Sequence, residues 1–195
     1  MRKLVLTLLT ALSVALSPTT TSANELEVWE KLQSGNPKGY VLLMRHAYAP
    51  GGGDPANFKL GDCTTQRNLS AKGRKDAAEI GSWLKSQQVK VLRVESSRWC
   101  RANETAKLLD LGKVRLNKNL DSLFQVADPV NNIQTARIKQ RIIKHRQKSG
   151  LLVMVGHFVN VVALTGVSLD SGEGVLVKAN KQGALKVLGY SPVPK

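Results

Sequence analysis

The chain has 195 residues, a formal net charge of +15 and 5% aromatic residues, with no internal repeat and no low-complexity tract. This length suits one domain with a substantial core and leaves little room for a second, which argues against multidomain and repeat architectures. So large a positive charge indicates anionic partners, but it does not distinguish nucleic acid from phosphorylated metabolites or anionic lipids.

The first 23 residues have the pattern of a secretory signal peptide. Arg2 and Lys3 precede an apolar run over residues 4–16, and small residues follow as far as Ala23. The run is too short to span a bilayer, so the pattern predicts cleavage after about Ala23 rather than a membrane span. The predicted mature protein is a single domain over residues 24–195 with a charge of 15 − 2 = +13, located in the periplasm or secreted.

The first elements predicted along the mature chain are a helix, a strand and a long loop. Residues 24–38 favour an amphipathic helix, and residues 40–44 form a continuous apolar run typical of a strand buried on both faces. The loop over residues 49–68 is rich in Gly, Pro and Asp, and loops of this length are often functional. Ser70 is a suitable N-cap for a helix that continues to about Gln88.

The second half of the chain alternates strands and helices and ends in a hairpin. The pattern predicts, in order, a strand from Val91, a helix over residues 98–110, a short strand at 114–116, a helix over 131–148, a strand over 151–155 and a hairpin of residues 174–179 and 184–190. Strands that alternate with helices before a terminal hairpin predict a three-layer α/β/α sandwich with a mixed, mostly parallel central sheet.

The helix predicted over residues 131–148 has a strongly basic face. No acidic residue occurs from 137 to 148, where six cationic side chains are found: Arg137, Lys139, Arg141, Lys144, Arg146 and Lys148. Such a face is usually only solvated. The functional alternative is steering of an anionic substrate or peripheral docking on an acidic envelope surface. His145 lies in the same segment, and we expect it to be solvated too.

Cys63 and Cys100 are the only cysteines of the chain. Export would permit a disulfide between them, while two unpaired thiols are equally compatible with the sequence. Together with the histidines they lack the paired ligand spacing of structural zinc sites, so we expect no metal and no other cofactor.

Two strands of the buried type end in a histidine. VLLMRH ends in Arg45 and His46, and LLVMVGH ends in His157. Because ligands of open α/β sheets bind beyond the carboxyl ends of the strands, both histidines are expected at one site if their strands are neighbours. The segment SSRWCRANETA adds Arg98 and Arg101 where a strand leads into the N-terminus of a helix, which suits an anion. Together these residues predict a phosphate site.

With these segments the chain resembles the histidine phosphatase superfamily, which has the phosphoglycerate mutase-like fold, and in particular a small exported bacterial-type member. The family's Arg-His-Gly strand end appears as Arg45-His46-Ala47, and its Leu-Ser with a glycine at a helix start appears as NLSAKGRKDA. Its Ser-Ser strand end with Arg-Ala-x-x-Thr-Ala appears as SSRWCRANETA, and its second histidine as VMVGH. Four motifs in the same order are far more specific than any one of them.

The resemblance implies a metal-independent phosphomonoesterase that works through a phosphohistidine intermediate. His46 would be the nucleophile, and Arg45, Arg101 and His157 would hold the phosphoryl oxygens. A neutral imidazole nitrogen is a competent nucleophile, and fixed cations stabilise the charge of an in-line phosphoryl transfer. Arg98 matches no role in the family.

The sequence departs from the family at two positions. Ala47 replaces the glycine after the nucleophile, which fits unless the backbone there requires a positive φ. The general acid is usually a glutamate after the third strand, and KNLDSLFQ contains none. Asp121 is the nearest carboxylate and the first candidate for this acid, with Asp54 and Asp62 of the long loop as rivals. Protonation of the leaving group typically contributes about 100-fold or more.

Three other functions stay open. Without the family's glutamate, the chain could be a non-catalytic protein that binds phosphate or another anionic ligand on the same fold. A phosphomutase would share the site, although predicted export separates the chain from glycolytic substrates. A nucleic-acid-binding module is supported by charge alone, and we do not expect one. The expected partner is an anionic phosphorylated small molecule or an envelope component, and the sequence specifies neither the substrate nor the oligomeric state.

Overall fold

The structure is a computed structural model that describes residues 23–33 and 36–191. The predicted signal peptide, apart from Ala23, therefore lies outside the described residues. None of the helices within the described ranges is long and apolar enough to cross a membrane.

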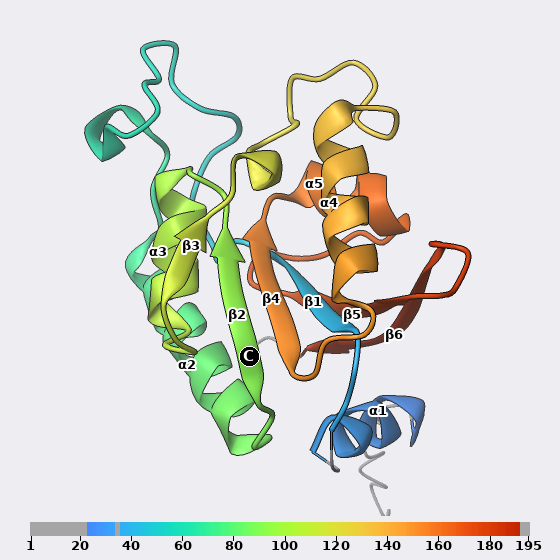
Figure 1. The fold of residues 1–195 in the computed structure, drawn as a ribbon. Helices are drawn as coiled ribbons and strands as arrows, with labels where there is room; N and C mark the ends of the chain where they lie inside the picture. The colour runs from blue at the N-terminus through green and yellow to red at the C-terminus, as the bar shows by residue number, and fades with distance from the viewer. Residues whose placement is uncertain (1–22, 34–35, 192–195) are drawn as a thin grey trace, which may run out of the picture.

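A six-stranded mixed sheet forms the middle layer (Figure 1). The strands follow the order β3-β2-β4-β1-β5-β6, and their bounds are β1 Tyr40–Arg45, β2 Val91–Ser96, β3 Val114–Leu116, β4 Leu151–Gly156, β5 Gly174–Ala179 and β6 Leu185–Ser191. β3, β2, β4 and β1 are parallel, whereas β5 runs antiparallel to β1 and β6 antiparallel to β5. The predicted mixed, mostly parallel sheet with a terminal hairpin is confirmed.

Helices cover both faces of this sheet (Figure 1). α2 (Ala71–Ser86) and α3 (Cys100–Leu108) pack on one face, and α4 (Ile133–His145) and α5 (Phe158–Thr165) on the other, while α1 (Ala23–Gln33) contacts β6. The predicted three-layer α/β/α sandwich is confirmed. The sequence did not reveal α5, because FVNVVALT is largely apolar and continues the apolar run of β4 after a single residue.

β1 is buried on both of its faces. Leu42 and Met44 belong to the core beneath α2 and α3, whereas Val41 and Leu43 belong to the core beneath α4 and α5. Because successive strand residues point to opposite faces, a strand between two helical layers needs a continuous apolar run rather than an alternating one. The central place of β1 also puts the residue that follows it, His46, in the middle of the sheet edge.

The helix predicted from residue 98 begins two residues later than expected. The backbone N–H of Arg98 donates to Asp121 Oδ1 over 2.9 Å, and that of Trp99 donates to Ser97 Oγ over 3.2 Å. These N–H groups are thus satisfied by side chains, and α3 begins only at Cys100, after Trp99 with its extended backbone conformation. The contact with Asp121 comes from a residue distant in sequence, which helix propensity does not include.

The expectation that His145 is solvated is wrong. His145 is fully buried, and its Nε2 lies 2.9 Å from the carbonyl oxygen of Gly150. The physical reason is helical spacing, since His145 follows Ile138 by seven residues and Ile142 by three, which places it on the inward face of α4. The basic face is also narrower than the sequence suggests, because Arg141 Nη2 donates to Glu95 Oε1 over 2.6 Å.

Gly73 lets α2 approach the backbone of Tyr48, in the chain that follows β1. A Cβ atom at Gly73 would lie 2.1 Å from the carbonyl oxygen of Tyr48, and the N-cap Ser70 accepts a hydrogen bond from the Gly73 N–H. We expect Gly73→Ala to lower the free energy of unfolding by about 1–3 kcal/mol, because the backbone at Tyr48 must shift. Urea unfolding measures this loss. Gly52→Ala is the control, since no atom lies within 4 Å of its Cβ position, and equal stability of both variants would contradict the prediction.

Candidate active site

Three strand ends meet at the carboxyl edge of the sheet. His46 follows β1, Ser97 follows β2 and His157 follows β4, and β4 pairs in parallel with both of the other strands. The centroids of the two imidazole rings lie 5.4 Å apart, with the rings inclined by 69°. The structure thus brings together two histidines that are more than one hundred residues apart in the chain.

The hydrogen bonds of His46 define its tautomer. Nδ1 lies 2.8 Å from the carbonyl oxygen of Ala47, which can only accept, so Nδ1 carries the proton. Nε2 then keeps its lone pair, and Arg101 donates its Nε–H to it over 3.2 Å. Ala47 does not have a positive φ, and its N–H donates to Thr105 Oγ1 over 3.0 Å, so alanine fits the position of the family's glycine. The nitrogen that faces the arginine is the one equipped to attack an electrophile.

Both imidazoles are held in the neutral form. Burial, together with the nearby cations Arg101, Arg67 and Arg45, lowers the pKa of His46 to about 3, although the hydrogen bond to the Ala47 carbonyl acts in the opposite direction. Burial also lowers the pKa of His157 well below its usual value, with the same cations contributing. Neutral imidazoles in a ring of cations suit the binding of an anion and nucleophilic attack upon it.

The buried histidines predict that the protein loses stability in mild acid. The unfolded chain takes up protons near pH 6.5, whereas folded His46 does so only near its pKa of about 3, so stability falls as the pH drops through this window. At pH 5 the loss from His46 alone is about 2 kcal/mol. Urea midpoints at about pH 7.5 and pH 5 measure it. His46→Gln should show a weaker pH dependence, and equal slopes in the two proteins would contradict the assignment.

A cavity of about 470 Å³ opens above the histidines. Arg45, Arg67 and Arg101 line it together with His46 and His157. Three exposed aromatic side chains also line it, and these are Tyr48, Phe124 and Phe158. The cavity therefore combines a cationic floor, which suits an anion, with apolar side chains around it.

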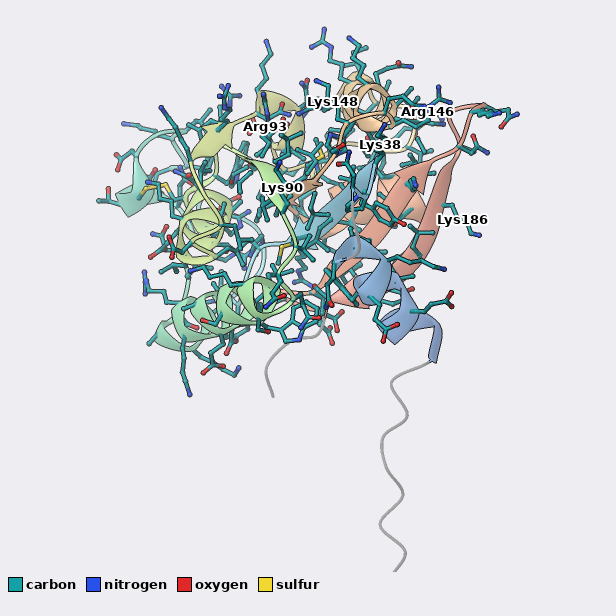
Figure 2. The ribbon with its side chains drawn as sticks, turned by 60° about the horizontal axis from the view of Figure 1, so that its bottom comes forward. Lys38, Lys90, Arg93, Arg146, Lys148 and Lys186 are labelled. Atoms are coloured by element: carbon teal, nitrogen blue, oxygen red, sulfur yellow. A yellow bond between two sulfur atoms is a disulfide. The ribbon has the colours of Figure 1, made fainter. Side chains whose placement is uncertain are left out.

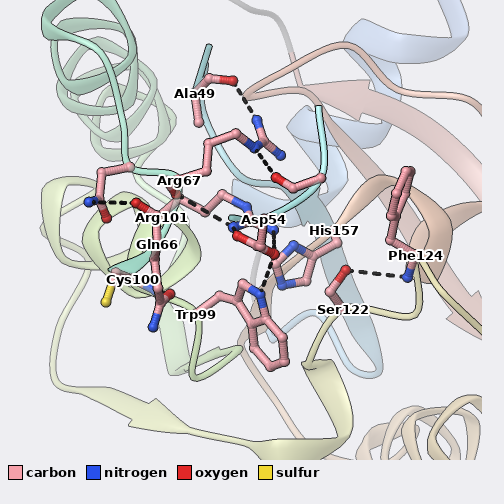
Figure 3. Close-up of polar contacts among 12 residues, drawn as sticks. Ala49, Asp54, Gln66, Arg67, Trp99, Cys100, Arg101, Ser122, Phe124 and His157 are labelled. Carbon is pink, nitrogen blue, oxygen red and sulfur yellow. Dashed lines mark hydrogen bonds and ion pairs between the residues drawn. The ribbon is translucent and has the colours of Figure 1, made fainter. Parts of the chain in front are cut away.

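Two of the three arginines are anchored by backbone carbonyls. Arg45 Nη1 donates to the carbonyl oxygen of Leu169 over 2.9 Å, and its buried Nε has no partner within the described part of the protein. Arg67 Nε donates to Gly53 over 2.8 Å, and its Nη1 donates to Ala49 (Figure 3). Sequence reasoning missed Arg67, because it lies inside the long loop and only the fold of that loop returns it to the site.

Asp54 binds the guanidinium group of Arg101 through both of its carboxylate oxygens. Its Oδ1 and Oδ2 accept hydrogen bonds from Arg101 Nη1 over 2.5 Å and Nη2 over 3.1 Å, and Trp99 Nε1 donates to Oδ2 over 2.9 Å (Figure 3). Partial burial of Asp54 would raise its pKa, but the hydrogen bonds from Arg101 and Trp99 outweigh this effect and keep the pKa below its usual value. The loop thus places a carboxylate ion inside the cavity, on the arginine fork.

Asp121 and Asp62 do not line this cavity. Asp121 is buried and accepts hydrogen bonds on Oδ2 from Arg98 Nε over 2.8 Å and Nη2 over 2.5 Å. Ser97 Oγ donates to its Oδ1 over 3.3 Å, and His157 Nε2 lies 2.9 Å from the same hydroxyl. Asp62 is exposed and accepts from the N–H and hydroxyl groups of Thr64. Asp54 is the carboxylate, of these three, that the structure places beside the histidines.

Cys63 and Cys100 form a disulfide, which settles the question that the sequence left open. It joins the loop over residues 49–68 to the first residue of α3, next to Arg101. Gln66 adds a second tie, since its Oε1 accepts the backbone N–H of Cys100 over 2.9 Å (Figure 3). The loop that carries Asp54 and the helix that carries Arg101 are thereby held together, which favours a fixed geometry at the site.

The architecture matches the phosphoglycerate mutase-like α/β fold of several solved phosphatase structures. A protein histidine phosphatase, SixA, solved with tungstate, has 18% sequence identity and a TM-score of 0.54 over 78% of this chain and 96% of its own. A mycobacterial glucosyl-3-phosphoglycerate phosphatase solved with VO3 has 15% identity and a TM-score of 0.55 over 80% and 99%. A phosphoserine phosphatase from Entamoeba histolytica, solved with 3-phosphoglyceric acid, has 13% identity and a TM-score of 0.56 over 78% and 96%. No protein-family model and no curated protein matches the chain.

Proposed function

We propose that the protein is an exported phosphomonoesterase of the histidine phosphatase type, with His46 as the nucleophile. The observation that carries this proposal is the hydrogen bond from Arg101 to His46 Nε2 at the floor of a cavity lined by Arg45, Arg67 and His157. The phosphatases of the same fold, two of which were solved with tungstate or VO3, support it. So do the four motifs that the sequence shares with the superfamily.

The first half-reaction forms a bond between His46 Nε2 and phosphorus. The phosphoryl oxygens bind to Arg45, Arg67 and Arg101, where they replace the Asp54 carboxylate on the guanidinium group. As Nε2 attacks, the bond from phosphorus to the ester oxygen breaks, and the leaving oxygen keeps the electron pair and takes up a proton. The arginines stabilise the charge of the equatorial oxygens throughout. In the second half-reaction water attacks phosphorus and gives a proton to the carboxylate that protonated the leaving oxygen. The bond from phosphorus to Nε2 breaks with its electron pair left on the nitrogen, so that phosphate leaves and His46 becomes neutral again.

Asp54 is the carboxyl group best placed to donate the proton. In the free protein Arg101 and Trp99 hold it ionised. Once a phosphate dianion takes its place on Arg101, Asp54 lies beside two like charges, which favours its protonated form. We propose a different role for Asp121. Ser97 connects it to His157 by hydrogen bonds, and this chain fixes the tautomer of the His157 imidazole.

The dependence of kcat on the leaving group distinguishes the proposed role of Asp54 from that of Asp121. A general acid matters for a poor leaving group and little for a good one, so Asp54→Asn should lower kcat for phenyl phosphate about 100-fold and change it little for p-nitrophenyl phosphate. Asp121→Asn should lower both rates by the same factor, because a misplaced His157 affects phosphate binding in every substrate. Steady-state kinetics with both esters tests this. If Asp121→Asn instead shows the selective loss, Asp121 is the acid.

The proposed activity itself is tested with the mature protein and p-nitrophenyl phosphate in the presence of a chelator. We expect turnover that orthovanadate inhibits, since vanadate binds where a phosphoryl group does. No turnover, together with phosphate binding that Arg101→Ala removes, would overturn the proposal in favour of a non-catalytic phosphate-binding protein. The ion pair of Asp54 with Arg101 is the feature that favours this second function, because it leaves no neutral carboxylic acid in the free site.

Export is part of the proposal, and it is inferred from the signal-peptide pattern of residues 1–23. A disulfide between Cys63 and Cys100 is in keeping with an oxidising compartment. Cell fractionation followed by N-terminal sequencing tests it. A cytoplasmic protein that retains Met1 would contradict it.

A further inference from the structure

A second cationic surface lies at the end of the sheet opposite the catalytic cavity. We define the basal basic surface by the six side chains that Figure 2 labels, which are Lys38, Lys90, Arg93, Arg146, Lys148 and Lys186. Lys38 precedes β1, Lys90 precedes β2 and Lys148 precedes β4, whereas the site histidines follow the carboxyl ends of the same parallel strands. Parallel strands therefore place the two cationic regions at opposite edges of one sheet.

Backbone contacts hold these segments side by side. The N–H of Gly39 donates to the carbonyl oxygen of Lys148 over 3.0 Å, and the N–H of Leu151 donates to that of Lys90 over 2.8 Å. In the hairpin, Lys186 lies directly across from Lys178. The surface is thus assembled from the starts of three strands, the end of α4 and the hairpin, and its labelled side chains lie in the upper middle and right of the view in Figure 2.

The positive charge of this surface has little compensation within the protein. Lys38, Lys90, Lys148 and Lys186 form no ion pair with any residue in the described ranges. Arg93 lies 4.0 Å from Glu95, a carboxylate that Arg141 already binds at 2.6 Å. Like charges directly across two strands are destabilising, and Lys178 opposite Lys186 is such a pair. An anionic partner would remove this cost.

The form of the surface fits a lipid bilayer better than a nucleic acid. Single strands and loops of nucleic acid are bound by aromatic side chains that stack on bases, but the exposed Tyr48, Phe124 and Phe158 line the catalytic cavity instead. The remaining exposed aromatic residue among those described is Tyr190. It lies near the end of β6, whereas Lys186 lies near the start of that strand. The basal surface instead exposes an aliphatic side chain, Leu92, which is 46% exposed between Lys90 and Arg93.

The place where the chain enters the fold also favours a bilayer. α1, which begins at the last residue of the predicted signal peptide, lies at the same end of the molecule as the start of β1 (Figure 1). Before its predicted cleavage, a signal peptide inserted in the membrane would bring the basal basic surface close to the lipid headgroups. Several lysines on one face attract anionic lipids through the negative surface potential of the bilayer.

From these observations we propose that the basal basic surface docks the protein on an anionic lipid bilayer, with the catalytic cavity open on the opposite side. Docking of this kind is electrostatic and peripheral, with Leu92 as an exposed apolar side chain beside Lys90 and Arg93. It leaves His46 accessible to phosphorylated molecules in the aqueous phase. The proposal does not depend on turnover, because the two regions share no residue.

Sedimentation with vesicles tests this proposal. We expect the mature protein to bind vesicles of phosphatidylglycerol and phosphatidylcholine at low salt, to dissociate as salt rises, and not to bind phosphatidylcholine alone. The triple variant Lys38→Glu, Lys90→Glu, Lys148→Glu should bind the anionic vesicles at least about 100-fold more weakly. Lys59→Glu, Lys75→Glu, Lys107→Glu is the matched control, with the same change of charge at exposed lysines elsewhere.

Each alternative gives a different result in the same experiment. An equal loss of vesicle binding in the two triple variants would show that binding depends on net charge and not on this surface, and it would overturn the proposal. So would equal binding to both kinds of vesicle. Tight binding of DNA in a gel shift, at a salt concentration where no vesicle is bound, would overturn it in favour of a nucleic acid. Circular dichroism of both variants shows that they are folded, and hydrolysis of p-nitrophenyl phosphate shows that the cavity is intact.

Discussion

His46→Ala is expected to remove turnover of phosphate esters, with a loss in kcat of about 10⁴-fold or more, because the reaction then has no atom to accept the phosphoryl group. Hydrolysis of p-nitrophenyl phosphate measures this loss. Binding of orthovanadate should survive in the variant, since Arg45, Arg67 and Arg101 still line the cavity.

The control for this prediction is the free energy of unfolding of the His46→Ala variant. His46 is buried and accepts a hydrogen bond from Arg101, so its removal leaves a small cavity and an unpaired N–H. Urea unfolding of His46→Ala therefore has to show a folded protein at the assay temperature before the kinetic loss is interpreted. A folded variant with wild-type activity would remove His46 from the mechanism.

Arg101→Ala is expected to have the second largest effect. Arg101 donates to His46 Nε2, and its guanidinium fork is the one that Asp54 occupies in the free protein. Loss of one fixed donor to a transferring group typically lowers kcat by about 100- to 1000-fold. We expect a loss in kcat/KM at the upper end of this range, because Arg101 also holds the phosphate in the ground state.

Arg74→Ala is the matched control for Arg101. Arg74 lies on α2 and binds Glu104 of α3 at 2.6 Å, on the surface and outside the cavity. The two variants remove the same side chain, but only Arg101→Ala should lose activity and vanadate binding. Similar losses in both would mean that the effect comes from the packing of α3 and not from contact with the phosphoryl group.

The layers of the fold were predictable because they depend on patterns that are local in sequence. Residues 40–44 and 151–155 are continuous apolar runs, and only strands between two helical layers need them. The positions of His46 and His157 follow from the same pattern, since each residue ends such a strand. The motif order then indicated the superfamily's fold.

The remaining features depend on contacts between distant segments. Arg67 and Asp54 reach the cavity only through the path of the loop over residues 49–68, which the disulfide and Gln66 tie to α3. No spacing in the sequence encodes that path. Asp121 shows the converse, because it is near the expected position of the acid in sequence, yet Arg98 and Ser97 hold its carboxylate away from the cavity.

The most direct test of the central claim is to trap the phosphoryl group on the protein. Wild-type protein would be mixed with a phosphate ester, quenched in alkali during turnover, digested and analysed by mass spectrometry. The mechanism predicts a phosphorylated imidazole in the peptide that contains His46, and none in His46→Ala. Phosphate on another residue, or hydrolysis with no phosphorylated peptide under conditions that preserve phosphohistidine, would contradict it.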